Sequence, residues 1–281
     1  LSLPKIYFAH ITNDIFSLNR FALYFKKTFT EDRRKYLLQM AAVAAGCIFV
    51  ILFIAFTDSG RYQHYNEYIA HYYQGTEFLD FYIMFFIGTI ALFATNMFSN
   101  LNDKTKRIAT LTSPASTLEK YMTRWILYVF IPIIMGVVIC VCSELIRCGV
   151  MSAIYEDPNN IIHPIGTNII LGDNPPYSNP VPTVMAMGIL AQSLFVLGSA
   201  IWPKISGIKT IAAVAILIFA YAMFGYGLSE LFLSDGSYYP NILTLEQSVN
   251  LGFATIAAGI LTNYVIAYYR FKEQEIIQRI L

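Results

Sequence analysis

Six uncharged, apolar runs alternate along the chain with polar segments rich in Tyr, Asn, Asp, Gly and Pro. Crossing about 30 Å of hydrocarbon takes about 20 residues of α-helix, and the six runs reach or approach that length. They are residues 38–57, 81–99, 125–143, 182–202, 210–229 and 247–269. Each run is apolar on all sides, whereas a helix of a soluble bundle has one polar face. The pattern predicts an all-α integral membrane protein with six transmembrane helices, in a transmembrane domain at residues 38–270.

The composition agrees with helices that face lipid. Of the 281 residues, 56% are hydrophobic and 13% are charged, whereas a soluble domain has about 25% charged residues. The net charge is +1, so no basic excess is present to attract a nucleic acid. We therefore expect membrane lipids as partners and no nucleic acid.

The distribution of Lys and Arg predicts the orientation of the helices. Seventeen of the 19 basic residues lie in the segments that share one side of the predicted topology, and the other side has only Arg61 and Arg147. Basic loops stay in the cytoplasm. Both termini are therefore expected there, the first as a segment covering residues 1–37 and the second as a tail covering residues 271–281.

The N-terminal segment contains an amphipathic pattern. One face of the expected helix is apolar, and the other carries Asn19, Arg20, Lys26 and Lys27; the apolar positions are Leu18, Phe21, Ala22, Phe25 and Phe29. Such a helix is expected to lie flat on the cytoplasmic leaflet, with its cations toward anionic headgroups. Asp32 and the three basic residues after it then mark a turn into the first span.

The cytoplasmic loop between the second and third spans carries two helix signals. Asn102 or Asp103 is expected to cap a short helix that runs to Leu111, with Ile108 and Leu111 as its apolar pair. Pro114 disfavours helical geometry in the residue before it. Ser116 and Glu119 match a capping box, which starts a second helix that continues into the third span. Within that span, Pro132 is a position where a kink is expected.

Catalytic chemistry is not indicated by the apolar runs. Glu144 and Arg147 lie at the outer end of the third span and are expected to reach water. The polar residues in the middle of the spans are amides and hydroxyls, namely Asn96, Gln192, Ser193 and Asn263. We therefore expect no catalytic residues.

A metal site is the weaker of two interpretations of the first outer loop. His64, Glu67 and His71 share one face of an expected helix, and these residue types bind divalent metals. The alternative is a tyrosine-rich helix on the outer leaflet, where tyrosine is enriched. We expect the second and therefore no bound metal.

The six-span layout and the segment Arg107-Ile-Ala-Thr-Leu-Thr-Ser-Pro-Ala-Ser-Thr-Leu-Glu-Lys120 resemble the permease subunit of ATP-binding-cassette exporters of the second type. Leu111, Pro114, Ser116 and Lys120 match the marked positions of that family's loop. In the family, an amphipathic connecting helix precedes the first span, and the loop between spans two and three docks on a separate ATPase.

The resemblance implies a permease that is not itself an enzyme, in a bacterial inner membrane. A cytoplasmic ATPase of the ABC type would bind ATP and Mg, and a second six-span subunit, identical or different, would complete the pathway. The coupling residues would be Lys104, Thr105, Lys106, Arg107, Ile108, Leu111, Pro114, Ser116, Glu119 and Lys120; the connecting helix would use Leu18, Phe21, Phe25 and Phe29.

The aromatic, weakly charged spans favour a lipid-like or amphipathic substrate for export. Two other functions remain open from the sequence. One is a membrane scaffold or sensor subunit that transports nothing, and the other is an intramembrane enzyme that modifies lipids. The absence of an ionisable cluster from the apolar runs disfavours the enzyme.

Overall fold

The structure is a computed structural model of the 281-residue chain, and it describes residues 16–57, 67–154, 165, 181–233 and 244–280. The described residues form helices and contain no strand. In chain order the elements are α1 (Leu18–Thr57), α3 (Glu67–Thr95), η1 (Ser99–Leu101), α4 (Lys104–Leu111), α5 (Thr117–Trp125), η2 (Ile126–Phe130), α6 (Ile131–Ile154), α8 (Val181–Ile201), α9 (Ser206–Leu233) and α10 (Leu245–Ile280). The predicted all-α class is confirmed.

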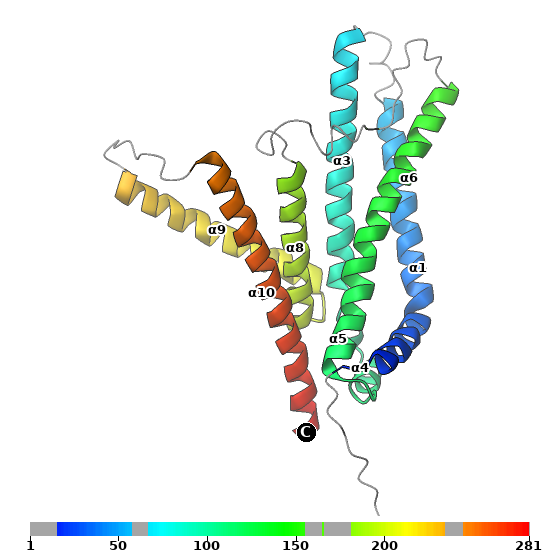
Figure 1. Ribbon diagram of the computed structural model, residues 1–281, viewed down its shortest axis with the longest axis vertical. Coiled ribbons are helices and arrows are strands. Elements are labelled where there is room, and N and C mark those ends of the chain that lie inside the picture. Colours follow the sequence, from blue (N-terminus) through cyan, green and yellow to red (C-terminus); the bar gives the residue numbers. More distant parts are fainter. Residues whose placement is uncertain (1–15, 58–66, 155–164, 166–180, 234–243, 281) are drawn as a thin grey trace, which may run out of the picture.

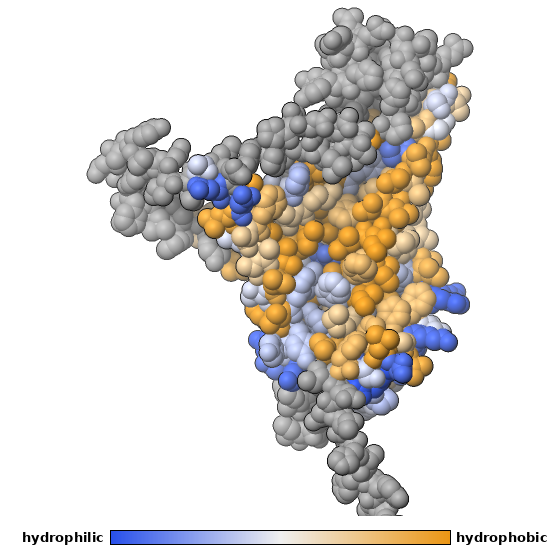
Figure 2. Space-filling view, viewed as in Figure 1, coloured by the Kyte–Doolittle hydropathy of each residue, from blue (hydrophilic) through white to orange (hydrophobic). Residues whose placement is uncertain are grey.

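Five helical segments are long and apolar enough to cross a membrane. They lie at Leu18–Thr57, Phe78–Leu101, Thr117–Ile154, Val181–Ile201 and Gln247–Gln274. The remaining predicted span, 210–229, lies within α9, whose apolar stretch with described side chains is Ser206–Ala220. Hydrophobic residues cover much of the middle of the visible surface, and hydrophilic residues lie toward its lower end and its upper left (Figure 2). These properties are those of a multi-pass membrane protein.

The predicted turn between an interfacial helix and the first span is wrong. Residues 18 to 57 form one α-helix of 40 residues, α1, that passes through Asp32 without interruption. Its buried residues are spaced at about helical repeats along one stripe; they are Tyr24, Thr28, Tyr36, Met40, Cys47, Ile51 and Ala55. A continuous stripe lets the helix stay regular while it packs on the other helices along its whole length. Figure 1 shows α1 curving at its lower, N-terminal end.

The helices pack in two groups that meet at α3. The first group is α1, α3 and α6, and the second is α8 with α10 on one side and α3 on the other (Figure 1). Tyr36, Phe93 and Tyr128 form the aromatic centre of the largest core, with ring centroids 5.4 Å apart for Tyr36 and Phe93 and 6.2 Å apart for Tyr36 and Tyr128. A second core joins α1, α3 and α6 further along, and includes Cys47, Ile51, Phe78, Tyr82, Ile139 and Met151. Helices α4 and α5 lie at the lower end, beside the N-terminal end of α1 (Figure 1).

Two glycines permit close helix contacts in the second group. A Cβ atom on Gly188 of α8 would lie 2.6 Å from Cγ1 of Ile87 in α3. A Cβ atom on Gly198 would clash with the Thr210 side chain of α9. Small residues let apolar helices approach closely and gain dispersion energy.

Helix α9 makes its contacts near its start. It packs on α8 and α3 around Thr210, which is buried, and then diverges from the other helices (Figure 1). Large apolar side chains further along it are exposed, including Ile216 and Phe219, each 68% exposed. In a membrane protein such surfaces face lipid or another subunit.

Candidate functional site

Helix α4 is an exposed, cationic helix at the lower end of the bundle. Asp103 caps it, because its carboxylate accepts a hydrogen bond of 2.9 Å from the Thr105 N–H. Lys104, Thr105 and Lys106 are exposed, and Ile108 is 50% exposed. The predicted bounds and cap of this helix are confirmed. The helix therefore presents positive charge and an apolar residue to the solvent.

A capping box starts α5, as predicted. The Ser116 hydroxyl accepts from the Glu119 N–H at 3.2 Å, and the Glu119 carboxylate accepts from the Ser116 N–H at 2.9 Å. Pro114 is exposed at the corner that precedes this box. Glu119 and Lys120 are 0% and 3% exposed, so these two predicted coupling residues lie inside the protein rather than on its surface.

Glu119 also binds the N-terminal end of α1. The Arg20 Nε lies 2.7 Å from Oε2 of Glu119, and the Arg20 Nη2 lies 2.8 Å from Oε1. The Ser17 N–H donates to the same Oε1 at 2.8 Å. Two hydrogen bonds from one guanidinium to one carboxylate fix the relative orientation of the two groups. Sequence analysis assigned Glu119 to the capping box and to the coupling residues, but it did not identify Arg20 as its partner, because these residues are 99 positions apart.

The surroundings of Glu119 keep it ionised. Burial alone would raise the pKa of this carboxyl group. The hydrogen bonds from Arg20, Ser17 and Ser116, with the positive charge of Arg20, outweigh burial and lower the pKa to about 2. Glu119 precedes Trp125, where the apolar run begins, so this charge lies at the lower end of the bundle. The ion pair is therefore present throughout the neutral pH range.

Arg124 joins α5 to three other segments. The residue is 3% exposed, and its Nη2 donates to Oγ1 of Thr110 in α4 at 3.2 Å. The guanidinium carbon lies 5.7 Å from the ring centroid of Phe98 and 5.5 Å from that of Phe271 in α10. Both distances are within the range of cation–π attraction. Sequence analysis had counted Arg124 only as one of the cytoplasmic charges.

Aromatic side chains strengthen the contact between α5 and α10. The Tyr121 hydroxyl donates to the Tyr264 carbonyl oxygen at 3.0 Å, and the rings of Tyr121 and Tyr268 are 5.4 Å apart. The rings of Phe98 and Phe271 are 5.3 Å apart. Helix α5 is thus connected to α1 by an ion pair and to α10 by aromatic packing. We call α4, α5 and these contacts the α4–α5 assembly.

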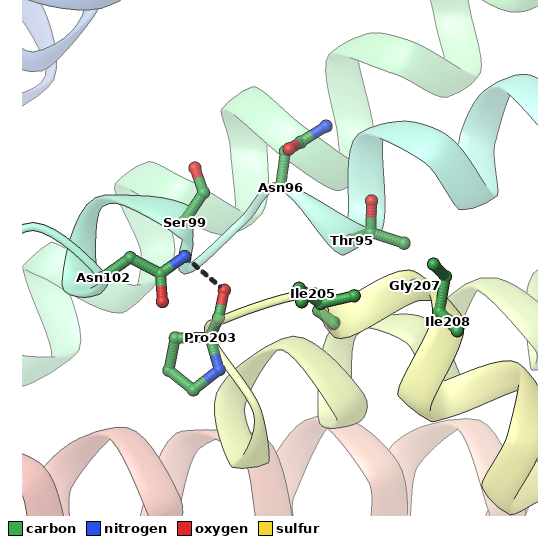
Figure 3. A pocket seen from close by; sticks show the side chains of 9 residues that line it. Thr95, Asn96, Ser99, Asn102, Pro203, Ile205, Gly207 and Ile208 are labelled. Carbon is green, nitrogen blue, oxygen red and sulfur yellow. Dashed lines mark hydrogen bonds between the residues drawn. The ribbon is translucent and has the colours of Figure 1, made fainter.

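The residues between α3 and α4 form hydrogen bonds to other parts of the protein. The Asn100 side chain donates to Asp32 of α1 at 3.1 Å, and the Asn102 side chain donates to the Pro203 carbonyl oxygen at 2.6 Å (Figure 3). Asp32, predicted to mark a turn, therefore holds the segment after α3 against α1. Ile205, in the connection between α8 and α9, has a φ of 57°, which is strained for a β-branched residue.

A cavity of about 320 Å³ lies between the end of α3 and the α8–α9 connection. Thr95, Ser99 and Gly207 are among its lining residues. Figure 3 shows the side chains of Asn96 and Ser99 extending away from the α8–α9 connection, so these polar groups do not converge on one point.

The aromatic residues at the start of α1 form a ladder. The centroid distances are 5.4 Å between Phe16 and Phe21, 6.2 Å between Phe21 and Phe25, and 6.4 Å between Phe25 and Phe29. Phe25 and Phe29 pack partly against the largest core, whereas Leu18 is 72% exposed. The predicted apolar face is therefore partly packed against other helices and partly exposed. The buried face of Tyr24 and Thr28 was missed, because both residues are polar.

The predicted exposure of Glu144 and Arg147 to water is wrong. They are 7% and 5% exposed, and the Arg147 Nη2 lies 2.7 Å from Oε1 of Glu144. Glu144 also accepts from the Tyr82 hydroxyl at 3.0 Å and from the Ile165 N–H at 3.1 Å. The Arg147 guanidinium carbon lies 4.3 Å from the Phe78 ring centroid. The two charges face the bundle interior and join α3 to α6, as charges at membrane depth usually do.

Three of the four mid-span polar residues come together. Gln192 and Ser193 of α8 are 0% exposed, and the Asn263 side chain of α10 donates to the Ser193 hydroxyl at 2.9 Å. Gln192 Nε2 lies 3.5 Å from the Val129 carbonyl oxygen of η2. Asn96 lies apart and bonds to its own helix at the Leu92 carbonyl oxygen. Such bonds hold apolar helices together in a membrane.

The predicted metal alternative is only partly covered by the described residues. His64 lies outside them, and Glu67 and His71 lie in the first turns of α3, where side chains are not described. Among the described residues, no group of three His, Cys, Asp or Glu side chains could hold a metal ion. Comparison of this chain with protein-family models, curated proteins and solved structures found no match.

Proposed function

We propose that this chain is the membrane-spanning permease subunit of an ATP-binding-cassette exporter, with six spans and both termini in the cytoplasm. The observation that carries the proposal is the α4–α5 assembly. The exposed cationic helix α4 is bonded through Thr110 to Arg124 of α5. Helix α5 in turn contacts α1 through Glu119 and α10 through Arg124. A partner that pushes on α4 therefore acts on two long helices at once. The resemblance of the loop sequence to such permeases supports the same function.

In the proposed mechanism, a separate ATPase binds ATP and Mg and closes against α4. Lys104 and Lys106 orient an acidic groove of that ATPase, and Ile108 enters it. Because the Arg20–Glu119 pair is bidentate, α5 and the start of α1 move as one body. The movement continues from α5 into α6 and, through Phe271, into α10.

The pathway itself requires a second membrane subunit. The exposed apolar surface of α9 supports this part of the proposal, since Ile216 and Phe219 are each 68% exposed. The weakly charged spans favour a lipid-like or amphipathic substrate over a small ion. We place the complex in a bacterial inner membrane, as the family resemblance implies.

The deciding experiment is copurification in mild detergent from the native host. The tagged chain is expected to retain a nucleotidase, and the preparation should hydrolyse ATP. Changing Ile108 and Leu111 to Asp would bury two charges in the groove, which costs several kcal/mol unless the subunits separate. The ATPase should then be lost while the permease keeps its fold.

The control is Ile205→Asp, which adds a charge at an exposed position outside α4. Ile205 is 57% exposed, and aspartate tolerates its left-handed backbone better than isoleucine does. This variant should retain the ATPase. If the double Asp variant retains as much ATPase as the control, α4 is not the docking helix. If no nucleotidase copurifies with the wild type, a scaffold or sensor subunit becomes the better interpretation.

A further inference from the structure

The helix that leaves the α4–α5 assembly is not α-helical throughout. Between α5 and α6, residues Ile126–Phe130 form a π-helical turn, η2, in which the Ile131 N–H donates to the Ile126 carbonyl oxygen five residues back. A π-turn contains one more residue than an α-turn, and such turns are frequent at functional sites. Leu127, Tyr128 and Val129 are buried within the turn. The irregularity therefore lies inside the protein, between the docking end and the membrane part of the helix.

Pro132 immediately follows the first residue of α6. Proline has no N–H, so it donates neither to Tyr128, its partner in an α-helix, nor to Leu127, its partner in a π-helix. The ladder of hydrogen bonds is thus weakened in both forms at the same place. Pro132 is fully buried, so solvent does not replace the missing donor.

Gln192 of α8 contacts this turn from the side. Its Nε2 lies 3.5 Å from the Val129 carbonyl oxygen, a long hydrogen bond, and its Oε1 has no partner among the described residues. The side chain is 0% exposed. A buried amide with one unpaired atom is unfavourable and needs an explanation. An apolar residue of similar size would fill the position without leaving a polar atom unpaired.

We propose that η2 is the joint through which the α4–α5 assembly rotates relative to α6, and that Gln192 is a positioning residue that holds the joint in its π form. This inference rests on the proposed function for its role in transport, but the joint itself does not require an ATPase. Conversion of the π-turn to an α-turn shifts the register by one residue. In a regular helix, one residue corresponds to about 100° of rotation and 1.5 Å of rise.

The proposal gives the buried amide of Gln192 a role that an apolar residue could not perform. In the π form, Gln192 binds the Val129 carbonyl group with its amide N–H, and its Oε1 stays free. When the turn rotates, Val129 moves away from α8 and the contact is lost. The hydrogen bond between Asn263 and Ser193 joins α10 to α8 and does not involve η2. This bond is therefore kept in both forms of the turn.

The test measures the joint directly in the full chain. Nitroxide labels are placed on Thr105 of α4 and Val137 of α6, both exposed, in a background without native cysteines and in lipid nanodiscs. Gln192→Leu removes the donor to Val129. Pro132→Ala removes the proline ring, which clashes with the Tyr128 carbonyl group only when the turn is α-helical, so both variants favour the α form. Both variants should shift the mean distance between the labels in the same direction, on the order of 5 Å for a one-residue rotation of the helix.

Asn263→Leu is the matched control, because it removes a polar contact of the same cluster without touching η2. It should leave the distance distribution as in the wild type. If Gln192→Leu folds and gives the wild-type distribution, the proposal is overturned. If Gln192→Leu does not fold, Pro132→Ala decides alone, and an unchanged distance in that variant overturns the joint. No ATPase is present in this measurement, so an unchanged label distance would not contradict the proposed docking of an ATPase on α4. Likewise, failure of an ATPase to copurify would not contradict the joint at η2.

Discussion

Arg20 and Glu119 form a bidentate ion pair between the start of α1 and the start of α5, with Nε and Oε2 2.7 Å apart. The carboxylate is fully buried, whereas the Arg20 side chain is 36% exposed. The same carboxylate closes the capping box of α5. One side chain therefore both starts a helix and fixes that helix to α1.

Arg20→Ala should destabilise the protein more than loss of a surface pair does. The variant leaves a buried carboxylate with backbone donors alone, and the loss of a hydrogen bond to a charged group costs about 1.5–3 kcal/mol. A double-mutant cycle with Glu119→Gln, followed by thermal unfolding in detergent, measures the coupling between the two residues. Lys27 and Glu31 provide the control: their pair is exposed and 3.9 Å apart, so Lys27→Ala should cost less than about 1 kcal/mol. Equal losses for Arg20→Ala and Lys27→Ala would show that the Glu119 contact contributes no more than a surface pair.

The contribution of Glu119 to the stability of the folded protein should depend on pH only under acidic conditions. Its pKa is lowered from 4.5 to about 2, so the folded state favours the ionised form. The stabilisation is fully present above about pH 4.5 and is lost as the pH falls toward 2. The difference in melting temperature between wild type and Glu119→Gln should therefore be constant from pH 8 to pH 5 and shrink below that. A difference that already declines between pH 7 and pH 5 would contradict the lowered pKa.

Replacing Arg147 alone should destabilise the protein more than replacing both Glu144 and Arg147. Arg147→Met leaves Glu144 charged and buried, which costs about 3–5 kcal/mol, whereas replacing both residues by Met is often close to neutral. Thermal unfolding of the two variants measures the difference. The exposed pair of Arg270 and Glu273 has the same spacing, and its single replacement should cost at most about 1 kcal/mol. A mild effect of Arg147→Met would mean that Glu144 reaches water.

The proposed orientation predicts which ends of the helices are accessible from outside the cell. In a background without native cysteines, Ser152→Cys at the end of α6 should react with an impermeant thiol reagent in intact cells, and Thr105→Cys in α4 should not. Both side chains are exposed in the structure, so a difference in labelling would report the side of the membrane and not burial within the protein. Labelling of Thr105→Cys only after the membrane is opened completes the test. The reverse pattern would invert the topology inferred from the basic residues.

The features that the sequence predicted correctly depend on residues close to one another along the chain. Helix α4, its Asp103 cap and the capping box of Ser116 and Glu119 are local patterns, and the structure confirms them. The predicted apolar runs 38–57, 210–229 and 247–269 each lie within one helix, and the other three runs are mostly helical. The predicted turn at Asp32 failed because charges alone do not end a helix, and Asp32 instead pairs with Asn100.

The features that were missed depend on contacts between distant segments. Nothing near Arg124 in the sequence indicates that its guanidinium lies against Phe98 and Phe271. Glu144 was expected to reach water because it follows the predicted third span, which ended at residue 143. Helix α6 instead continues to Ile154, and Tyr82 and Ile165 from other segments bond to the Glu144 carboxylate. A helical pattern gives the spacing of residues along one helix and does not identify the partner helix.

The uninterrupted course of α1 has a mechanical consequence. At 1.5 Å per residue, its 40 residues span roughly 60 Å, about twice the thickness of the hydrocarbon layer. If α1 crosses that layer once, part of the helix extends beyond it, and Glu119 binds this helix near its N-terminal end. A tilt of about 5° displaces one end of a straight 60 Å helix by about 5 Å relative to the other. Because no loop interrupts α1, a displacement near Arg20 is passed along the helix toward Thr57.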